Sequence, residues 1–261
     1  MRADVPVARV FVPSLRTQII FHALFIPVLC LTWEGLVRAG LLKGTIVGRP
    51  LLVLQQLWEL LTTRGTLDAV GVTVSEVGIG LALGAASGIA LGAVLSYLPF
   101  LRRGLDSLFI ALYTLPRVAL VPLFIAWFGL GMASKVSAVF IHGFVLFLLG
   151  TYATVESVDR ALLRNFRMLC APRWRYVAEI YLPWGVSHFF IVFRQAFGLA
   201  IGTAVVAELI GSFEGVGYEI GLRIGAFDMN GTLAWVLIIA TLAVVVDRFV
   251  ASFEARLLAW R

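Results

Sequence analysis

The chain has 261 residues, of which 61% are hydrophobic and 14% are charged. Soluble domains carry about 25% charged residues, so this composition, with a mean hydropathy of +0.97, excludes an ordinary soluble protein. The bases behind the net charge of +6 lie between apolar segments, where lipid headgroups and topology account for them, so we expect a lipid bilayer as partner and no nucleic acid.

Six segments each supply the roughly 20 mainly apolar residues that a transmembrane helix needs. Arginines precede the first segment, as in a signal peptide, but no small-residue cleavage site follows it, so we expect an uncleaved span. The predicted fold class is an all-α polytopic membrane protein with about six transmembrane helices. In chain order the predicted spans are 18–37, 68–98, 106–128, 134–154, 184–207 and 232–250.

The stretch between the first two spans, 38–67, carries leucines at helical spacing beside Gln55, Gln56 and Glu59. This pattern predicts an amphipathic helix lying in the membrane interface. We therefore expect three parts in the chain. They are 1–67, with the first span and this extracytoplasmic helix; 68–250, the transmembrane core; and 251–261, a cytoplasmic tail.

The distribution of Lys and Arg predicts the orientation in the membrane, because these residues favour the cytoplasmic side. With the N-terminus inside, most of them fall on the inner side of the six spans, although the bases in 38–67 oppose this bias. An even number of spans then places both termini in the cytoplasm.

The second span contains a regular stripe of glycines, at positions 80, 84, 88 and 92. Residues four apart lie on one face of a helix, and small residues there let two helix backbones approach closely. The stripe predicts a packing face, either within this chain, which we favour, or against another subunit. Its members are Gly80, Gly84, Gly88 and Gly92.

Polar residues and prolines inside spans are costly and point either to a pathway or to structural pairing. Arg194 is either part of a pathway or one partner of a structural ion pair. Pro116 and Pro122 indicate either a helix break beside the pathway or a static kink. Glu76 and Glu208 either line a pathway or lie at the outer interface. The candidate pathway or gate residues are Pro116, Arg117, Pro122, Arg194, Gln195 and Glu208.

The sequence offers no pattern for chemistry of its own. It contains no Gly-Lys-Ser or Gly-Lys-Thr with which to cradle ATP phosphates. Its three histidines, His22, His142 and His188, are far apart and have no partner at metal-ligand spacing. We expect neither catalytic residues nor a metal site.

The longest connection on the inner side, 155–183, is charged and also carries apolar residues at helical spacing. A simple reversal needs about 2–8 residues, so this length predicts a helical platform for another protein, broken by Pro172 and ended by Pro183. A basic loop that only sets topology is the alternative.

The same connection resembles the cytoplasmic signature loop of ABC importer permeases, which reads Glu-Ala-Ala, three residues, Gly, nine residues, Ile, one residue, Leu-Pro. Ile180, Leu182 and Pro183 stand in register with it. The front half departs from it. Arg164, Asn165 and Phe166 stand where Glu-Ala-Ala would be, and Cys170 stands where Gly would be.

Further segments extend the resemblance over about 50–261, to permeases of the nitrate/sulfonate/taurine/bicarbonate type. Asp159 lies in a segment that resembles the approach to the signature loop. The other matching segments are 116–122, 127–131, 133–135, 206–211, 215–218, 247–248 and 254–256.

This resemblance implies the permease subunit of an ATP-driven importer in a bacterial cytoplasmic (inner) membrane. It implies two ABC ATPase subunits that bind ATP and Mg²⁺, a second permease subunit that is identical or different, and an extracytoplasmic solute-binding protein. The implied coupling-loop residues are Asp159, Arg164, Asn165, Phe166, Cys170, Ile180, Leu182 and Pro183.

Two other classes of protein are the alternatives. An ion-coupled secondary transporter would favour inverted repeats and a paired intramembrane acid, but the sequence has no clear internal repeat and no carboxylate at the middle of a predicted span. A membrane-embedded enzyme would need a convergent catalytic cluster within spans, and none is visible. A small anion, such as a sulfonate, taurine or nitrate, is the expected substrate class.

Overall fold

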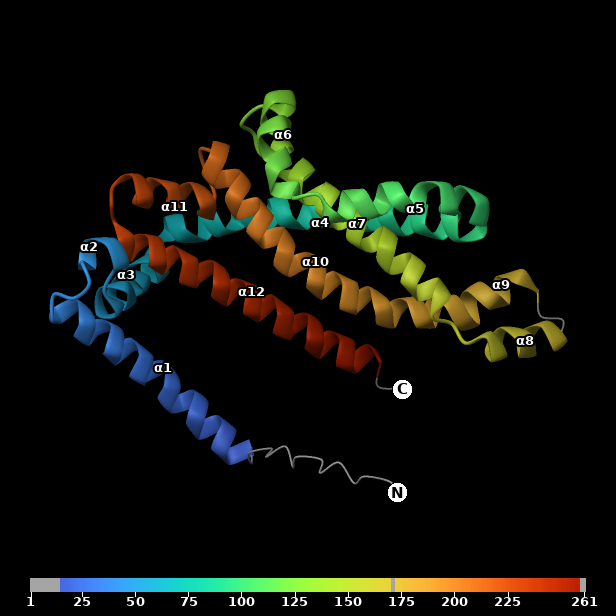
Figure 1. Cartoon of the computed structure of the whole chain (residues 1–261), viewed down its shortest axis with the longest axis horizontal. Helices are drawn as coiled ribbons and strands as arrows, with labels where there is room; N and C mark the ends of the chain where they lie inside the picture. Colours follow the sequence, from blue (N-terminus) through green and yellow to red (C-terminus); the bar gives the residue numbers. More distant parts are fainter. Residues whose placement is uncertain (1–14, 170–171, 259–261) are drawn as a thin grey trace, which may run out of the picture.

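The computed structural model describes residues 15–169 and 172–258, and every regular element within them is helical. The long helices run lengthwise along the molecule, short helices lie at both of its ends, and one short helix stands out from its middle (Figure 1). The elements are α1 (Leu15–Arg38), α2 (Gly44–Val47), α3 (Pro50–Thr62), α4 (Arg64–Tyr97), α5 (Pro99–Thr114), η1 (Arg117–Leu120), α6 (Val121–Phe128), α7 (Met132–Glu156), α8 (Arg160–Met168), α9 (Arg173–Arg175), η2 (Tyr176–Tyr181), α10 (Leu182–Gly211), α11 (Val216–Gly225) and α12 (Met229–Leu257).

Helix α7 packs on the glycine stripe of α4. A Cβ added at Gly80 would contact Val139, and one added at Gly84 would contact Gly143. Each step of four residues along α4 is therefore matched by a step of four residues along α7. The two helices therefore run parallel. The other two pairs in this register are Gly88 with Phe147 and Gly92 with Thr151.

This parallel register explains the path of the connection between the two helices. It places the end of α4 level with the end of α7, so the chain must return along the full 25 residues of α7, or roughly 37 Å at 1.5 Å per residue. That distance exceeds the hydrocarbon thickness of a bilayer, about 30 Å. Helices α5, η1 and α6 together therefore make one crossing.

The third predicted span, 106–128, is broken, so of the two alternatives for Pro116 and Pro122 the structure has the helix break. Residues Arg103–Thr114 and Arg117–Phe128 meet at 87°. Pro116 disfavours helical dihedrals at the residue before it, and Leu115 is extended, with φ −63° and ψ 132°. Gly129, at φ 78°, ends α6 as left-handed glycines commonly do.

The segment before Pro183 also differs from expectation, because Pro183 does not end a helix. The chain stays helical from Arg173 through the π-helix η2 into α10. Proline supplies no N–H to the preceding turn, and here the Leu182 amide bonds to the Val177 carbonyl, five residues back. This wider winding carries the helix past the proline.

The core lies where α4, α7, α10, α11 and α12 meet, and it includes Val77, Val139, Ala200 and Trp235. Helix α10 runs antiparallel to α7, since Phe189 stacks on Phe147 with ring centroids 5.5 Å apart while Thr203 contacts His142. Helix α11 was not among the predicted elements.

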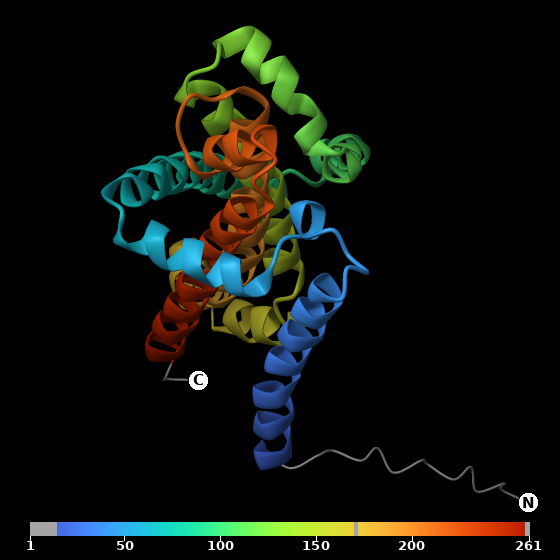
Figure 2. The same cartoon turned by 90° about the vertical axis from the view of Figure 1, so that its left-hand side faces the viewer.

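Helix α1 stands apart from this core (Figure 2). Glu34 joins it to the next elements, accepting a hydrogen bond from Arg49 at 3.3 Å and one from Arg38 at 2.9 Å. Helix α3 packs on α12 through one face, where Leu57 and Leu60 contact the core, while Leu51, Trp58 and Leu61 stay exposed.

Among the described residues, four helices are long and apolar enough to cross a membrane, and there are up to five spans when the bent pair is counted as one. The four are α4, α7, the continuous helix 176–211 and α12. Helix α1 covers the first predicted span as one helix, and its crossing of the membrane stays a prediction.

Candidate functional site

The candidate coupling segment, 155–183, forms a hairpin of α8 against α9 and η2 at one end of the bundle (Figure 1). Asp159 begins α8 by accepting a hydrogen bond from the Ala161 amide at 2.7 Å, the usual role of an N-cap aspartate. The rings of Phe166 and Tyr176 meet at 5.6 Å and join the two arms. Ile180 is buried at the root of the hairpin.

The hairpin presents a basic outer surface. Arg164 and Asn165 are exposed on α8, and Leu182 is exposed beyond the π-helix. Trp184 anchors the root by donating to the Ser157 hydroxyl at 2.9 Å. Cys170, the position at which the loop pattern would have Gly, lies outside the described residues.

The six candidate pathway residues do not form one site. Pro116 and Pro122 flank η1 at the broken crossing. Arg117 turns toward backbone carbonyls, donating to Tyr113 at 3.0 Å and to His142 at 3.4 Å. Gln195 is exposed on α10.

Arg194 is one partner of an ion pair between α10 and α12. Its guanidinium donates to both carboxylate oxygens of Asp247, at 2.7 and 3.0 Å, and lies 3.9 Å from Glu254. Such a bidentate pair is directional and charge-assisted. The geometry is that of the structural alternative for Arg194.

Glu208 is buried beneath α11. Its carboxylate accepts the Thr73 hydroxyl at 2.7 Å and the Gly217 amide at 2.6 Å. Thr73 in turn accepts the Val216 amide at 3.0 Å. The first amides of a helix have no partner within it, so Glu208 and Thr73 together cap α11.

The glycines of the turn before α11 make this contact possible. Gly215 has φ 101° and lies so close that an added Cβ would stand 2.4 Å from the Glu208 carboxyl carbon. At Gly217 an added Cβ would stand 2.2 Å from the Val205 carbonyl oxygen. Only glycine fits at either position, because a side chain would displace the cap.

Two further ionisable side chains share this buried site. Glu76 of α4 is 2% exposed and lies one helical turn beyond Thr73, the residue that bonds Glu208. Lys135 of α7 is 1% exposed, and its ammonium donates to the carbonyls of Leu130 and Gly131. Glu76, Lys135 and Glu208 are therefore all buried at the end of the bundle that carries α11.

This cluster was hidden in the sequence because its members come from three separate helices. Glu76, Lys135 and Glu208 each looked like a residue near a membrane surface. The spacing that could have revealed them is the α4–α7 register, since a four-residue step from Gly80 back to Glu76 leads along α7 from Val139 back to Lys135.

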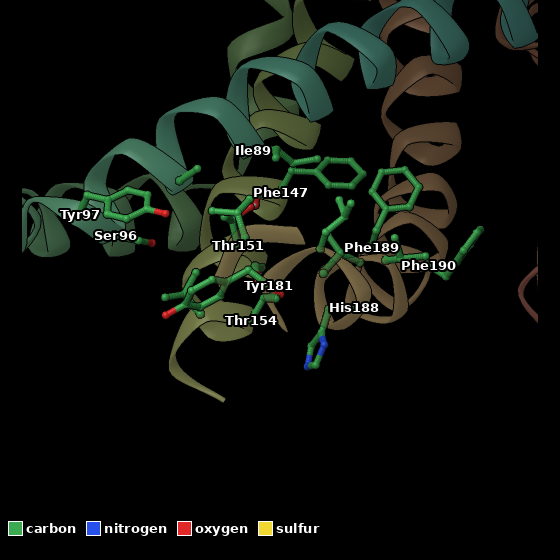
Figure 3. A pocket seen from close by; sticks show the side chains of 18 residues that line it. Ile89, Ser96, Tyr97, Phe147, Thr151, Thr154, Tyr181, His188, Phe189 and Phe190 are labelled. Carbon is green, nitrogen blue, oxygen red and sulfur yellow. Dashed lines mark hydrogen bonds between the residues drawn. The ribbon is translucent and has the colours of Figure 1, made fainter. Parts of the chain in front are cut away.

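A cavity of about 550 Å³ lies at the opposite end of the bundle, beside the coupling hairpin. Figure 3 shows the rings of Phe147 and Phe189 on one side of it and the phenols of Tyr97 and Tyr181 on the other. No Lys, Arg, Asp or Glu is among its lining residues in the described chain. The residues that line the cavity come from α4, α7, η2 and α10. The cavity therefore lies between the root of the hairpin and the core.

Asp228 connects α11 to α12 at the end of the bundle remote from the hairpin. Its carboxylate accepts the Gly231 amide at 3.0 Å and Arg223 at 3.0 Å. Burial disfavours its ionised form, but the Gly231 amide, Arg223 and Gln56 outweigh burial and hold the pKa of Asp228 below its usual value. The charge therefore stabilises the fold above the ordinary aspartate pKa, and this contribution is lost as pH falls through the lowered value.

We expect Asp228→Asn to reduce the free energy of unfolding at neutral pH by roughly 0.3–1 kcal/mol, because Asn can still cap α12 but loses the negative charge that the helix N-terminus and Arg223 stabilise. The difference from wild type should vanish in acid. Thermal unfolding of the purified protein at both pH values measures it. Asp68→Asn, an exposed aspartate at the start of α4, is the control, and a difference that persists in acid would contradict the assignment.

Comparison with known proteins assigns this chain to a family and finds its fold in a solved structure. Residues 78–259 match the family described as "Binding-protein-dependent transport system inner membrane component". A bacterial ABC transporter involved in the import of the acidic polysaccharide alginate shares the fold, with a TM-score of 0.61 at 15% identity over 92% of this chain and 96% of that one.

Two sequence relatives are similar over nearly their whole length. A putative aliphatic sulfonates transport permease protein of Bacillus subtilis is 28% identical over 88% of this chain and 83% of its own. A formylaminopyrimidine transport permease protein of Halalkalibacterium halodurans is 26% identical over 94% and 97%. The chain therefore belongs to the family of binding-protein-dependent inner membrane components, the multi-pass permease subunits of ABC importers, in which a partner ATPase binds ATP and the permease does no catalysis.

Proposed function

We propose that this chain forms the translocation pathway of an ATP-driven importer together with a second permease subunit, identical or different. Two ATPase subunits dock on the hairpin 155–183, and a solute-binding protein delivers the substrate at the opposite end. The observation that carries this proposal is the continuous helix 176–211, which joins the hairpin directly to the buried site under α11.

The proposed orientation has both termini and the hairpin in the cytoplasm of a bacterium, and α2, α3 and α11 outside. The parallel α4 and α7, and the antiparallel α10 and α12, support it by bringing the hairpin and the end of α12 to one end of the bundle. The parts 1–67, 68–250 and 251–261 remain the proposed division of the chain.

For the substrate we propose a small organic anion, with sulfonates and taurine tested first. The support is the sulfonate relative. The formylaminopyrimidine relative makes heterocycles the second class to test. Arg194 supplies no free positive charge to an anion in this conformation, since Asp247 and Glu254 surround it.

The buried acid pair raises the alternative of an ion-coupled secondary transporter. Against that alternative, Glu208 caps a helix and Lys135 lies beside the pair, so the acids have structural partners. Uptake into vesicles distinguishes the two mechanisms, because an ATP-driven importer needs ATP and continues when the proton gradient is dissipated.

The first test is purification of the tagged chain from its native host in mild detergent, with identification of the proteins that accompany it. An ABC ATPase in stoichiometric amount is the expected result. A second, different permease would indicate a mixed pair. Recovery of the chain alone or as a homodimer in several detergents would contradict the proposal.

We expect Arg164→Glu to change ATPase coupling without preventing membrane insertion. Arg164 is exposed on α8, so reversing its charge alters the surface offered to the ATPase while leaving the core intact. ATPase retained on the tagged permease and ATPase activity both measure the effect. Arg64 is exposed at the start of α4, away from the hairpin, so Arg64→Glu should leave ATPase retention and ATPase activity unchanged. Equal behaviour of the two variants would remove Arg164 from the contact.

A further inference from the structure

We propose that Arg117, at the break between α5 and α6, binds the anionic group of the substrate as it passes the middle of the membrane. This inference rests on the proposed function, because it takes the substrate to be a small organic anion and the pathway to run between two permease subunits. It adds the residue that recognises the charge. The chemical group that this residue would take is an oxyanion, a sulfonate or a carboxylate.

Arg117 lies level with the middle of the neighbouring span. Its guanidinium donates to the backbone carbonyl of His142 at 3.4 Å, and since α7 begins at Met132, His142 is the eleventh of its 25 residues. At roughly 1.5 Å per residue, this position is about 15 Å from the start of the helix. Ionisable residues at such a depth are rare, and they face the interior of the protein or a water-filled cavity.

The turn that carries Arg117 is open on one side of the subunit. None of the four residues of η1, Arg117–Leu120, is buried, and Pro116 and Val118 are exposed. Helix α6, which follows this turn, stands out from the middle of the bundle (Figure 1). Irregular backbone within a membrane does not face lipid, because lipid leaves its polar groups without partners. The open side of η1 therefore faces the second subunit or the pathway between the two.

The positive charge of Arg117 has no acidic partner among the described residues. Its two hydrogen bonds go to backbone carbonyls, of Tyr113 at 3.0 Å and of His142 at 3.4 Å, which orient the guanidinium without cancelling its charge. The Tyr113 ring also supports it, with the guanidinium carbon 5.5 Å from the ring centre. Arg194, by contrast, is surrounded by two carboxylates. Arg117 therefore keeps a charge that a ligand can neutralise.

The guanidinium of Arg117 also keeps hydrogen-bond donors for that ligand. A guanidinium carries five N–H groups in a flat fork, and the two carbonyls engage Nη1 and Nη2 once each. The remaining donors, with Nε–H among them, have no hydrogen-bond partner in the described part of the chain. Such a fork matches two oxygens of a carboxylate or a phosphate, and a sulfonate offers the same tetrahedral set of oxygens as a phosphate. The site therefore favours a small oxyanion over a neutral solute.

Uptake by the whole importer, reconstituted in vesicles with its ATPase subunits and binding protein, tests this inference. With ethanesulfonate as the substrate, Arg117→Gln should reduce ATP-driven uptake by about tenfold to a hundredfold, the size expected for lost hydrogen bonds to a charged group. Arg117→Lys keeps the charge and should recover part of the loss. ATPase activity stimulated by the binding protein should persist in both variants, because the hairpin 155–183 is unchanged.

Arg103→Gln is the matched control, since Arg103 is an exposed arginine near the start of the same crossing. It should take up ethanesulfonate at the wild-type rate. Full uptake by Arg117→Gln would overturn the inference and leave the proposed function intact. A wild type that imports no sulfonate would instead contradict the proposed substrate class, and the labelling of η1 then decides whether Arg117 faces the pathway.

Cysteine labelling tests the charge without any assumption about the substrate. In a chain whose two cysteines, Cys30 and Cys170, are replaced by serine, Val118→Cys places a thiol next to Arg117 at an exposed position. A water-soluble anionic thiosulfonate reagent should label this thiol. Adding Arg117→Gln should lower the labelling rate with the anionic reagent, relative to a cationic one, by about tenfold or more.

An unlabelled thiol, or the same ratio of rates with and without Arg117, would overturn the inference. If Arg117→Gln fails to fold, labelling of Val118→Cys in excess ethanesulfonate decides, because a bound anion should slow the reaction. A labelling rate that ethanesulfonate leaves unchanged would then count against an anion site.

Discussion

Gly88→Leu should prevent the bundle from folding. A Cβ at Gly88 would stand 2.5 Å from the Phe144 carbonyl oxygen and 3.0 Å from the Leu148 amide nitrogen. Both are backbone atoms of α7, so no side-chain rotation can make room, and the two helices would have to separate along their whole contact. Overpacking of a core typically costs about 1–3 kcal/mol, and a backbone collision should exceed that range.

The recovery of monodisperse protein from mild detergent measures this effect. Gly78→Leu is the matched control, because it lies in the same helix with nothing within 4 Å of its added Cβ. We expect near-normal recovery for Gly78→Leu and almost none for Gly88→Leu. Equal recovery of both would mean that α4 and α7 do not pack through the glycine stripe.

Gly185→Trp should stop transport while leaving the subunit folded. Gly185 lines the inner cavity of about 550 Å³, and its added Cβ meets nothing within 4 Å, so the indole can enter without a collision. We expect transport to bring the hairpin closer to the core and so to shrink this cavity. Each 1.4 kcal/mol or so added to the state with the smaller cavity reduces its population about tenfold, so we expect uptake to fall by about tenfold or more.

Substrate uptake and ATPase activity of the reconstituted complex, measured together, test this prediction. Gly71→Trp adds the same ring at an open position of α4 remote from the cavity and should retain both activities. Full uptake by Gly185→Trp would show that the cavity keeps its volume through the cycle.

The straight helices were predictable because hydropathy and length alone define them. The expected span 134–154 became α7, Met132–Glu156, and 232–250 became α12, Met229–Leu257. The broken crossing was only half predictable. Pro116 and Pro122 gave the position of the break, but the angle of 87° depends on how α6 packs against α7.

The buried cluster could not be predicted in the same way, because it depends on register between helices. Nothing local distinguishes Lys135 from a base at the membrane surface. Its burial follows from the glycine stripe, which fixes α7 against α4. Helix α11 escaped prediction for a related reason, since its ten residues are too few to span and its cap, Glu208, lies in the preceding helix.

The hairpin was foreseen as a helical platform, but its connection to the core was not. Pro183 predicted an end, on the rule that proline interrupts a helix. The π-helix Tyr176–Tyr181 accommodates it instead, a rearrangement of backbone hydrogen bonds that residue pattern does not reveal.

The unbroken helix from Tyr176 to Gly211 has the proportions of a lever arm. Its 36 residues extend for about 50 Å at roughly 1.5 Å per residue. A tilt of about 5° at the hairpin would carry the far end sideways by roughly 4 Å, more than the length of a hydrogen bond. Because Glu208 sits near that far end and holds α11, a small rotation at one membrane surface is enough to break a contact at the other.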